Sequence, residues 1–138
     1  MRGIPRAFSG SIELTLAAFF AVVLCTVAVP SNASTITVTN TNDSGPGSLR
    51  DALATAVDGD KIDATGISGT ILLTSGELQI PHAVTIEGPG AGSLSIDGNG
   101  TFRVFHNLTS GVNISGFTIT NGSNSGGNGG GILHEGGN

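Results

Sequence analysis

Three aspartates, Asp58, Asp60 and Asp63, form the densest group of side chains that could bind a metal ion. Hard cations such as calcium take about six to eight oxygen ligands, several of them from carboxylates. However, the glutamate that completes a helix–loop–helix calcium site is missing, and an Asp-Gly-Asp run after a helix commonly forms a turn. We therefore expect a turn here, with calcium binding as the open alternative, and we assign no metal or cofactor site.

Polysaccharide cleavage is the second chemistry to consider. A lyase needs a base, commonly Lys or Arg, beside a bound cation, and a glycosidase needs carboxylates that converge within several ångströms. Arg103 is the best-placed base, because it lies between the apolar residues Phe102 and Val104 and should point outward. Asp97 and Glu87 are the acids nearest to the expected strands, but no carboxylate pair recurs at a regular spacing. We expect no catalytic residue in this chain.

Three histidines, His82, His106 and His134, follow one another at intervals of 24 and 28 residues. In a repetitive fold this spacing could stack the imidazoles on successive turns, where a column of them can bind a metal. Isolated histidines in polar loops are more often solvated, and we expect that of these three.

Aromatic rings that could stack on a sugar are scarce in this sequence. The chain has neither Trp nor Tyr, which usually carry that role. Phe105 is the one ring that we expect at the surface. This composition argues against a dedicated carbohydrate site.

Short apolar strands that recur along the chain must position these residues. Three triplets, 71–73, 94–96 and 117–119, start 23 residues apart, and the outer two residues of each are large and apolar. Such alternation presents two side chains to one face of a strand. A second series, V-x-I-x-G, matches 84–88 with 112–116 at a distance of 28 residues, and the loop 88–92 accounts for the extra length.

Turns of about 23 residues that stack on one another form a parallel β-helix. The inward aliphatic side chains then form continuous columns, which we predict to be Ile71/Leu94/Phe117 and Leu73/Ile96/Ile119. A small β-sandwich also uses short strands and glycine turns. The constant step favours the all-β solenoid, and we assign its turns to residues 67–138.

Residues 34–66 read as a cap over the first turn of this solenoid. A strand is expected at 36–39, followed by a turn and by a helix over 48–57 that ends before Gly59. Ser48 and Asp51 have the spacing of a capping box, in which each side chain satisfies a free backbone N–H group. Apolar residues at helical spacing after Ser48 should cover the open end of the core.

The order of these elements resembles that of secreted bacterial right-handed parallel β-helix repeat proteins. The segment Gly-Pro-Gly-Ser-Leu-Arg-Asp-Ala-Leu at 45–53 is similar to a Cys-Ser-Leu-Arg-Glu-Ala segment near the start of many of them, with Gly47 in place of Cys and Asp51 in place of Glu. Gly130-Gly131-Ile132 is similar to half of a motif in polymorphic outer-membrane proteins, whose companion Phe-x-x-Asn is absent. The resemblance, which covers most of 35–138, implies a right-handed solenoid at the cell surface. Residues 129–134 resemble the start of a further turn and no cap-like segment follows them, so we expect the chain to be truncated at its C-terminus.

Residues 1–33 are typical of a Sec-type signal peptide. Arg2 and Arg6 give a positive start, 14–29 is an uncharged, mostly apolar run of 16 residues, and small residues precede an expected cleavage after Ala33. A membrane anchor is the alternative, but a spanning helix usually needs about 20 apolar residues. We expect that the mature part does not span a membrane. It should be secreted, or lie at the cell surface or the outer membrane.

The mature chain, 34–138, would carry three basic against nine acidic side chains, a net charge of −6, and no cysteine. Such a surface repels phosphate backbones, so nucleic acid is not an expected partner. We expect a structural or adhesive surface protein whose partner is an extracellular polysaccharide or a host or cell-surface protein. The alternative is the N-terminal part of a polysaccharide lyase or glycoside hydrolase of the pectin-degrading type, with its active site beyond residue 138.

Overall fold

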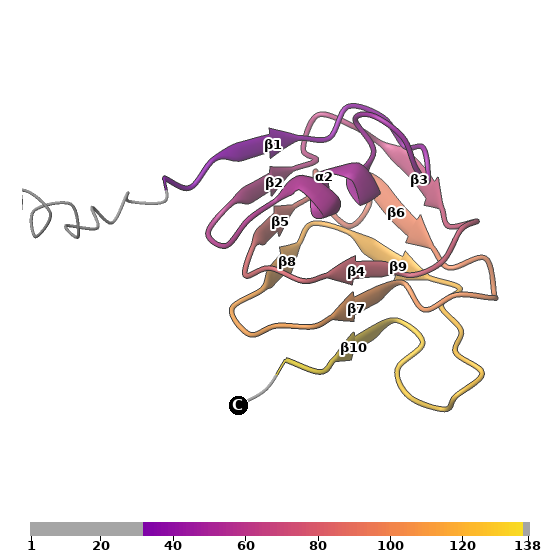
Figure 1. Ribbon diagram of the computed structural model, residues 1–138. Coiled ribbons are helices and arrows are strands. Elements are labelled where there is room, and N and C mark those ends of the chain that lie inside the picture. The colour runs from indigo at the N-terminus through magenta and orange to yellow at the C-terminus, as the bar shows by residue number, and fades with distance from the viewer. Residues whose placement is uncertain (1–31, 137–138) are drawn as a thin grey trace, which may run out of the picture. The chain divides into compact units, whose positions relative to one another are not determined.

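The computed structural model describes residues 32–136, so the expected signal peptide lies outside the described residues except for Asn32 and Ala33. The described residues form a parallel β-solenoid of about four turns with one short helix (Figure 1). This confirms the parallel β-helix predicted from the repeats. None of the helices within 32–136 is long and apolar enough to cross a membrane.

Each of the three sheets gathers one strand from each successive turn, and all neighbouring strands are parallel. The first sheet contains β1 (Thr35–Thr37), β2 (Lys61–Asp63), β5 (Thr85–Glu87) and β8 (Asn113–Ser115). The second contains β3 (Gly69–Leu72), β6 (Leu94–Asp97) and β9 (Thr118–Thr120). The third contains β4 (Leu78–Ile80), β7 (Phe105–Asn107) and β10 (Ile132–His134).

Inward side chains of each sheet form a column through the core. In the first sheet Ile86 pairs with Ile114, which confirms the 28-residue match between the two V-x-I-x-G segments. In the second sheet Ile96 pairs with Ile119, a step of 23, but Ile71 pairs with Ile96, a step of 25. The predicted columns that joined residue 71 to 94 and 73 to 96 are therefore wrong by two residues. A slip of two keeps every side chain on its own face, so the hydrophobic pattern cannot detect it.

The glycines that end the two V-x-I-x-G segments, Gly88 and Gly116, lie at a corner where the backbones of two neighbouring turns are in contact. A Cβ atom on Gly116, whose φ is +77°, would lie 2.4 Å from the carbonyl oxygen of Gly88 in the turn above. The Gly88 N–H donates to the Ser115 carbonyl at 2.8 Å. Only a residue without a side chain fits this approach, and Gly116 also needs the left-handed backbone.

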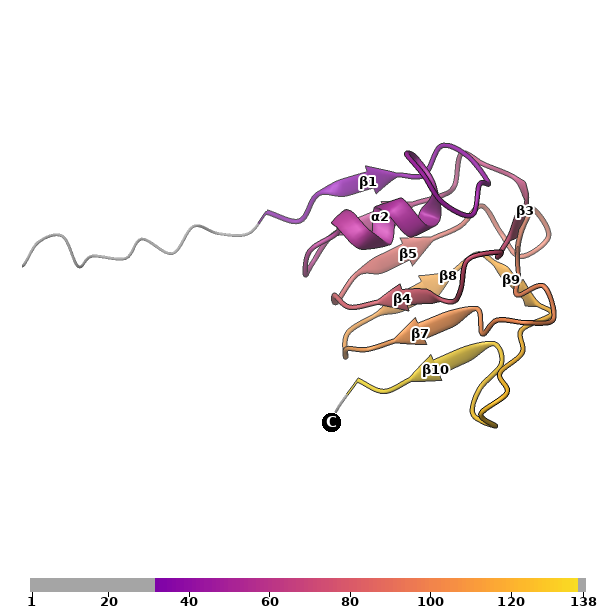
Figure 2. The ribbon, with the colours of Figure 1, turned by 45° about the vertical axis from the view of Figure 1, so that its right-hand side comes forward.

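The helix α2 (Leu49–Thr55) covers the end of the core next to β1, as predicted (Figure 2). The Ser48 hydroxyl accepts from the Asp51 N–H at 3.1 Å, while the Asp51 carboxylate accepts from the Gly47 N–H at 3.4 Å. The helix is shorter than the predicted range 48–57, because Ala56 already adopts an extended backbone. The turn at Gly59 follows later, and its N–H donates to Ala83 of the next turn at 2.8 Å.

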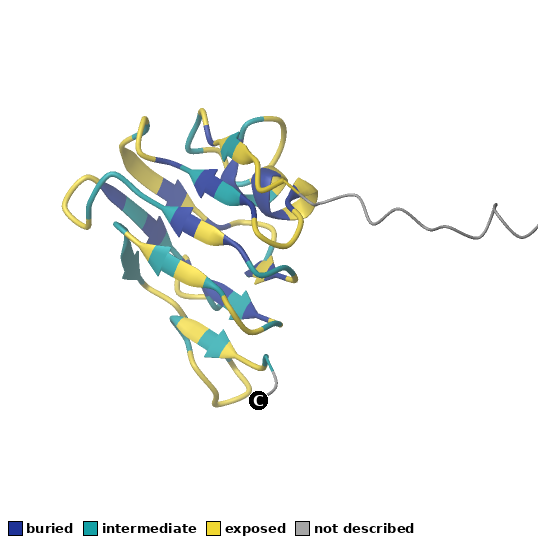
Figure 3. Ribbon diagram, turned by 90° about the vertical axis from the view of Figure 1, so that its left-hand side faces the viewer, coloured by how far each residue is buried: buried dark blue, intermediate teal, exposed yellow. Residues whose placement is uncertain are grey.

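Burial falls along the solenoid from the capped end toward β10 (Figure 3). The inward residues of β2, β4, β5 and β6 are almost fully buried, whereas those of β8 and β9 are half-buried and those of β10 are exposed. Within 32–136 no strand lies against the far edge of the last turn, so its inward residues keep contact with water.

Candidate functional site

Four ionisable side chains meet on the outer face of the third sheet, and we call them the outer-face cluster: Glu77, Arg103, His106 and Glu135. The His106 Nδ1 atom lies 2.7 Å from Oε1 of Glu77, and its Nε2 atom lies 2.9 Å from Oε2 of Glu135. The Arg103 Nη1 atom donates to Oε2 of Glu77 at 2.9 Å. Glu77 precedes β4, His106 is in β7 and Glu135 follows β10, so the cluster joins three turns.

Strand alternation positions His106 at the centre of this cluster. Phe105 and Asn107 on either side are buried, so the imidazole between them points outward. In the parallel register His106 pairs with Gln79 of β4 and with Leu133 of β10. The sequence analysis did not detect this grouping, because the contacts join residues 29 positions apart.

The charges of the cluster stabilise one another. Hydrogen bonding to Glu135, and then to Glu77, raises the pKa of His106 above its ordinary value of 6.5, although partial burial opposes the rise. Burial works to raise the pKa of Glu77, but the hydrogen bond from His106 and the positive charges of His106 and Arg103 outweigh it and lower that pKa. The arrangement favours an imidazolium that donates from both nitrogens, so His106 has no free lone pair with which to act as a base.

Arg103, the predicted candidate base, is also fully engaged. Its Nε atom donates to the Gly129 carbonyl at 2.9 Å and its Nη2 atom to the Asn128 carbonyl at 3.1 Å. With the ion pair to Glu77, these bonds connect the preceding turn to the following one. The side chain is only 10% exposed, so the guanidinium holds turns together and does not face a substrate.

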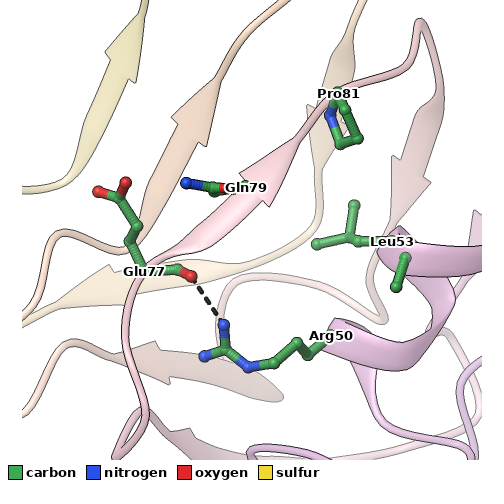
Figure 4. Close-up of a pocket in the computed structure, with 6 residues that line it drawn as sticks. Arg50, Leu53, Glu77, Gln79 and Pro81 are labelled. Atoms are coloured by element: carbon green, nitrogen blue, oxygen red, sulfur yellow. Dashed lines mark hydrogen bonds between the residues drawn. The ribbon is translucent and has the colours of Figure 1, made fainter.

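A hollow of about 300 Å³ lies beside the cluster, between α2 and β4 (Figure 4). It is lined by Arg50, Leu53, Ala54, Glu77, Gln79 and Pro81. Arg50 donates to the Glu77 carbonyl and to the Gly76 carbonyl, each at 2.7 Å, so its guanidinium is used to attach the helix to the turn before β4. The exposed amide of Gln79 is the polar group of this wall that points outward from β4.

Arg50 also forms an ion pair with Asp43, a contact that was not predicted from the sequence. The Arg50 Nη2 atom lies 2.8 Å from the Asp43 carboxylate, which also accepts from the hydroxyls of Thr74 and Ser75. Burial alone would raise the pKa of Asp43, but the hydrogen bonds from Ser75, Arg50 and Thr74 lower it to about 2. The Arg50–Asp43 pair therefore fixes the cap to the following turn.

Two of the three clustered aspartates face separate partners. Asp58 accepts from the Ala83 N–H at 2.9 Å and contacts Nδ1 of His82 at 3.3 Å. Asp63 accepts from the N–H and the hydroxyl of Thr65 at 2.9 and 2.7 Å. These contacts lower the pKa of both carboxyls, chiefly through the Ala83 N–H for Asp58 and the Thr65 hydroxyl for Asp63.

The third aspartate, Asp60, is buried, with an exposed fraction of 3%. Its Oδ1 atom accepts from the backbone N–H of Ser34 at 2.8 Å, and its Oδ2 atom accepts from that of Val57 at 2.9 Å. In the part of the chain that the structure describes, no three His, Cys, Asp or Glu side chains are grouped so that they could hold a metal ion.

The three histidines do not form a column. His106 pairs with Leu133, and the neighbouring His134 pairs with Asn107, so the two imidazoles lie on opposite faces of the third sheet. The His134 ring lies 2.9 Å from the Asn107 amide at the open end of the core. His82 lies outside the strands. The stacking that the spacing allowed is therefore not present.

The remaining candidates also bond across turns. Asp97 accepts from the Asn121 amide at 3.0 Å, and Glu87 forms an ion pair with Lys61. The expectation that Phe105 lies at the surface is wrong, because its ring is fully buried. Val104 and Phe105 are both buried, so the chain bends there and the inside–outside alternation changes phase.

No protein-family model matches the sequence, and neither a curated protein nor a solved structure is significantly similar to it.

Proposed function

We propose that this chain is a secreted or cell-surface protein with a structural and adhesive role. The proposal rests on one observation: the outward charged side chains form ion pairs that link neighbouring turns. Lys61 with Glu87, and His106 with Glu77 and Glu135, bond residues of one turn to residues of the next. Charged groups committed in this way strengthen a rod, whereas an active site needs acids and bases that are free to reach a substrate.

The second sheet offers a surface suited to adhesion. Its outward residues Thr70, Ser95 and Thr118 are in register on successive turns and form a row of hydroxyl groups. A row of small polar side chains can form weak hydrogen bonds with an extended partner, such as an extracellular polysaccharide or a cell-surface protein. The segment at 45–53 resembles one in secreted bacterial β-helix proteins, and Gly130-Gly131-Ile132 resembles half of a motif in polymorphic outer-membrane proteins. Both similarities support a role at the cell surface.

A polysaccharide-degrading enzyme is the second candidate, and the hollow beside Glu77 favours it. The residues Glu77 and Gln79 both line a space of about 300 Å³. In a lyase or glycosidase such a space would hold part of the sugar chain. The two candidates differ in whether a bound polymer is cut.

The test uses the secreted chain, with circular dichroism to show that it is soluble and rich in β-structure. Binding to pectin, alginate and intact cells is measured beside release of shortened sugars, with and without calcium. We expect binding without cleavage, and binding that weakens when Thr70 and Ser95 are changed to Lys. Cleavage that disappears in Glu77→Gln would overturn the structural role and support the enzyme, whereas absence of any binding would contradict adhesion.

A further inference from the structure

Both backbone polar groups of Ser34, which directly precedes β1, are hydrogen-bonded. Its N–H group donates to Oδ1 of Asp60 at 2.8 Å, and its hydroxyl donates to the same oxygen at 3.0 Å. Its carbonyl accepts from the Lys61 N–H at 2.8 Å. The next residue, Thr35, pairs with Lys61 in the parallel register of β1 and β2. The backbone nitrogen of Ser34 is therefore fixed against a carboxylate before the sheet begins.

Asp60 is an anion that lacks a full positive partner. Hydrogen bonds from the backbone N–H groups of Val57 and Ser34 and, to a smaller extent, the charge of His82 lower its pKa, so the carboxylate is ionised at neutral pH. No Lys or Arg within 32–136 forms a salt bridge with it. A buried carboxylate is costly unless it is both hydrogen-bonded and paired with a positive charge. Both oxygens of the Asp60 carboxylate thus accept hydrogen bonds, but its negative charge has no Lys or Arg partner among the described residues.

The expected signal-peptide cleavage would supply that charge at the right atom. Hydrolysis of the Ala33–Ser34 peptide bond adds water: Ala33 gains the carboxylate, and the Ser34 nitrogen becomes an amine that takes up a proton. Asn32, Ala33 and Ser34 are all exposed, so the bond is accessible to a peptidase. We propose that Asp60 is a receptor for the new N-terminus, and that cleavage after Ala33 replaces the hydrogen bond from a neutral amide with an ion pair between the ammonium group and the carboxylate, which holds β1 in place. This inference rests on the export that is part of the proposed function.

The two states of Ser34 differ in charge and in the number of donors. Before cleavage the nitrogen is an amide with a single N–H group, which Asp60 already accepts. After cleavage it is an ammonium group with three N–H groups and a positive charge. The Asp60 carboxylate is charged in both states, so cleavage adds the Coulomb attraction between ammonium and carboxylate to the existing hydrogen bond. The first layer of the solenoid should thus be held more firmly in the processed chain than in its precursor.

The pH range of this effect follows from the two groups. The ammonium is favoured by Asp60, so its pKa in the folded chain is raised above the ordinary value of about 7.7–8.0 for an α-amino group. Its contribution is complete below that ordinary value and disappears as the pH rises through the raised one. The contribution of Asp60, whose pKa is lowered from 3.8, is lost as the pH falls through the lowered value.

The experiment starts from the secreted product, whose first residue is identified by N-terminal sequencing and intact mass. The pKa of its α-amino group is then measured by NMR titration in three proteins: the unaltered chain, Asp60→Asn and Asp58→Asn. Asp58 is the matched control, because it is also an aspartate of this segment but bonds to Ala83 and not to Ser34. We expect a raised pKa in the unaltered and Asp58→Asn proteins, and an ordinary one in Asp60→Asn.

A second measurement compares the processed chain with an uncleaved chain in which Ala33→Phe blocks the peptidase. At neutral pH we expect the unfolding equilibrium constant of the processed chain to be about threefold to tenfold smaller. That advantage should vanish in Asp60→Asn and persist in Asp58→Asn.

The outcomes separate the steps of the inference. A product that begins at a residue other than Ser34 would overturn the cleavage site. A product that begins at Ser34 with an α-amino pKa that is ordinary, or unchanged by Asp60→Asn, would overturn the receptor role of Asp60. A raised pKa in a chain that binds no polymer or cell would support the receptor and contradict only the adhesive function.

Discussion

The imidazole Nδ1 of His106 lies 2.7 Å from the carboxylate of Glu77, a residue of the preceding turn. The pKa of His106 is raised above 6.5, so the stability from this contact is complete below pH 6.5 and is lost as the pH rises through the raised value. The pKa of Glu77 is lowered from 4.5, so its share is present above pH 4.5 and is lost as the pH falls through the lowered value.

The first prediction is therefore a maximum of stability between about pH 4.5 and 6.5. His106→Gln should remove about 1 kcal/mol from the free energy of unfolding at pH 6 and make it less dependent on pH above that. Urea unfolding at a series of pH values measures both effects. His82→Gln serves as the control, because His82 contacts only the exposed Asp58. Equal pH profiles for the unaltered chain and His106→Gln would contradict the role of the cluster.

A second prediction concerns the register of the second sheet. Ile96 is fully buried between Ile71 and Ile119, whereas Ser95 points outward between Thr70 and Thr118. Ile96→Asp should cost at least about 3 kcal/mol, since it buries an unpaired carboxylate. Ser95→Asp should stay within about 0.5 kcal/mol. Denaturant unfolding of both variants decides, and similar losses would mean that the strand faces are wrongly assigned.

A third prediction concerns the attachment of the cap. Arg50 bonds to Asp43 and to two backbone carbonyls, which an ammonium group on a lysine stem cannot reach together. We expect Arg50→Lys to lower the free energy of unfolding by about 1–3 kcal/mol. Amide hydrogen exchange should locate the loss in α2, and an equally large effect of Arg103→Lys on α2 would argue against a local attachment.

The same attachment should resist acid. The pKa of Asp43 is lowered to about 2, so its stabilising contribution is present above its ordinary value of 3.8 and is lost only as the pH falls toward 2. In Asp43→Asn this acid-sensitive contribution is absent. We expect the protection of α2 amides to decline between pH 4 and 2 in the unaltered chain and to be low and nearly constant in the variant.

A fourth prediction tests the corner formed by stacked glycines. A Cβ atom at Gly116 would lie 2.4 Å from the Gly88 carbonyl oxygen and would require a left-handed backbone. At Gly92, by contrast, a Cβ atom meets nothing within 4 Å. Gly116→Ala should lower the thermal stability by more than about 1 kcal/mol, and Gly92→Ala should leave it unchanged or slightly higher. Calorimetry on the two variants provides the comparison.

The sequence was sufficient to predict the solenoid where inward residues are large and apolar. The alternating triplets identify the strands of the second sheet, the two V-x-I-x-G segments identify β5 and β8 of the first, and Ser48 with Asp51 marks the start of the helix. Of the third sheet, only the turn at 129–134, which contains β10, was expected, while β4 and β7 were missed. The inward positions of this sheet include Asn107 and His134, so β7 and β10 lack the apolar alternation that reveals a strand.

The outer-face cluster could not be predicted for another reason. Its contacts depend on which residues of different turns are neighbours, and that depends on the register and on the lengths of the loops. His106 and Glu77 are 29 positions apart, a distance that matches no single repeat length. The change of phase at Val104 and Phe105 also hid the outward direction of His106.

The glycine corner between β5 and β6 shows that the length of a loop can vary while the pairing of the strands stays constant. Paired residues of neighbouring turns are 23 positions apart in one place and 28 in another, yet each column stays aligned. The longer loop 88–92, whose residues Ala91 and Gly92 are exposed, leaves the strands on either side in place. A foreign peptide inserted into this loop should therefore be displayed on the surface of the solenoid, while the inward aliphatic residues and the pairing of the strands stay unchanged.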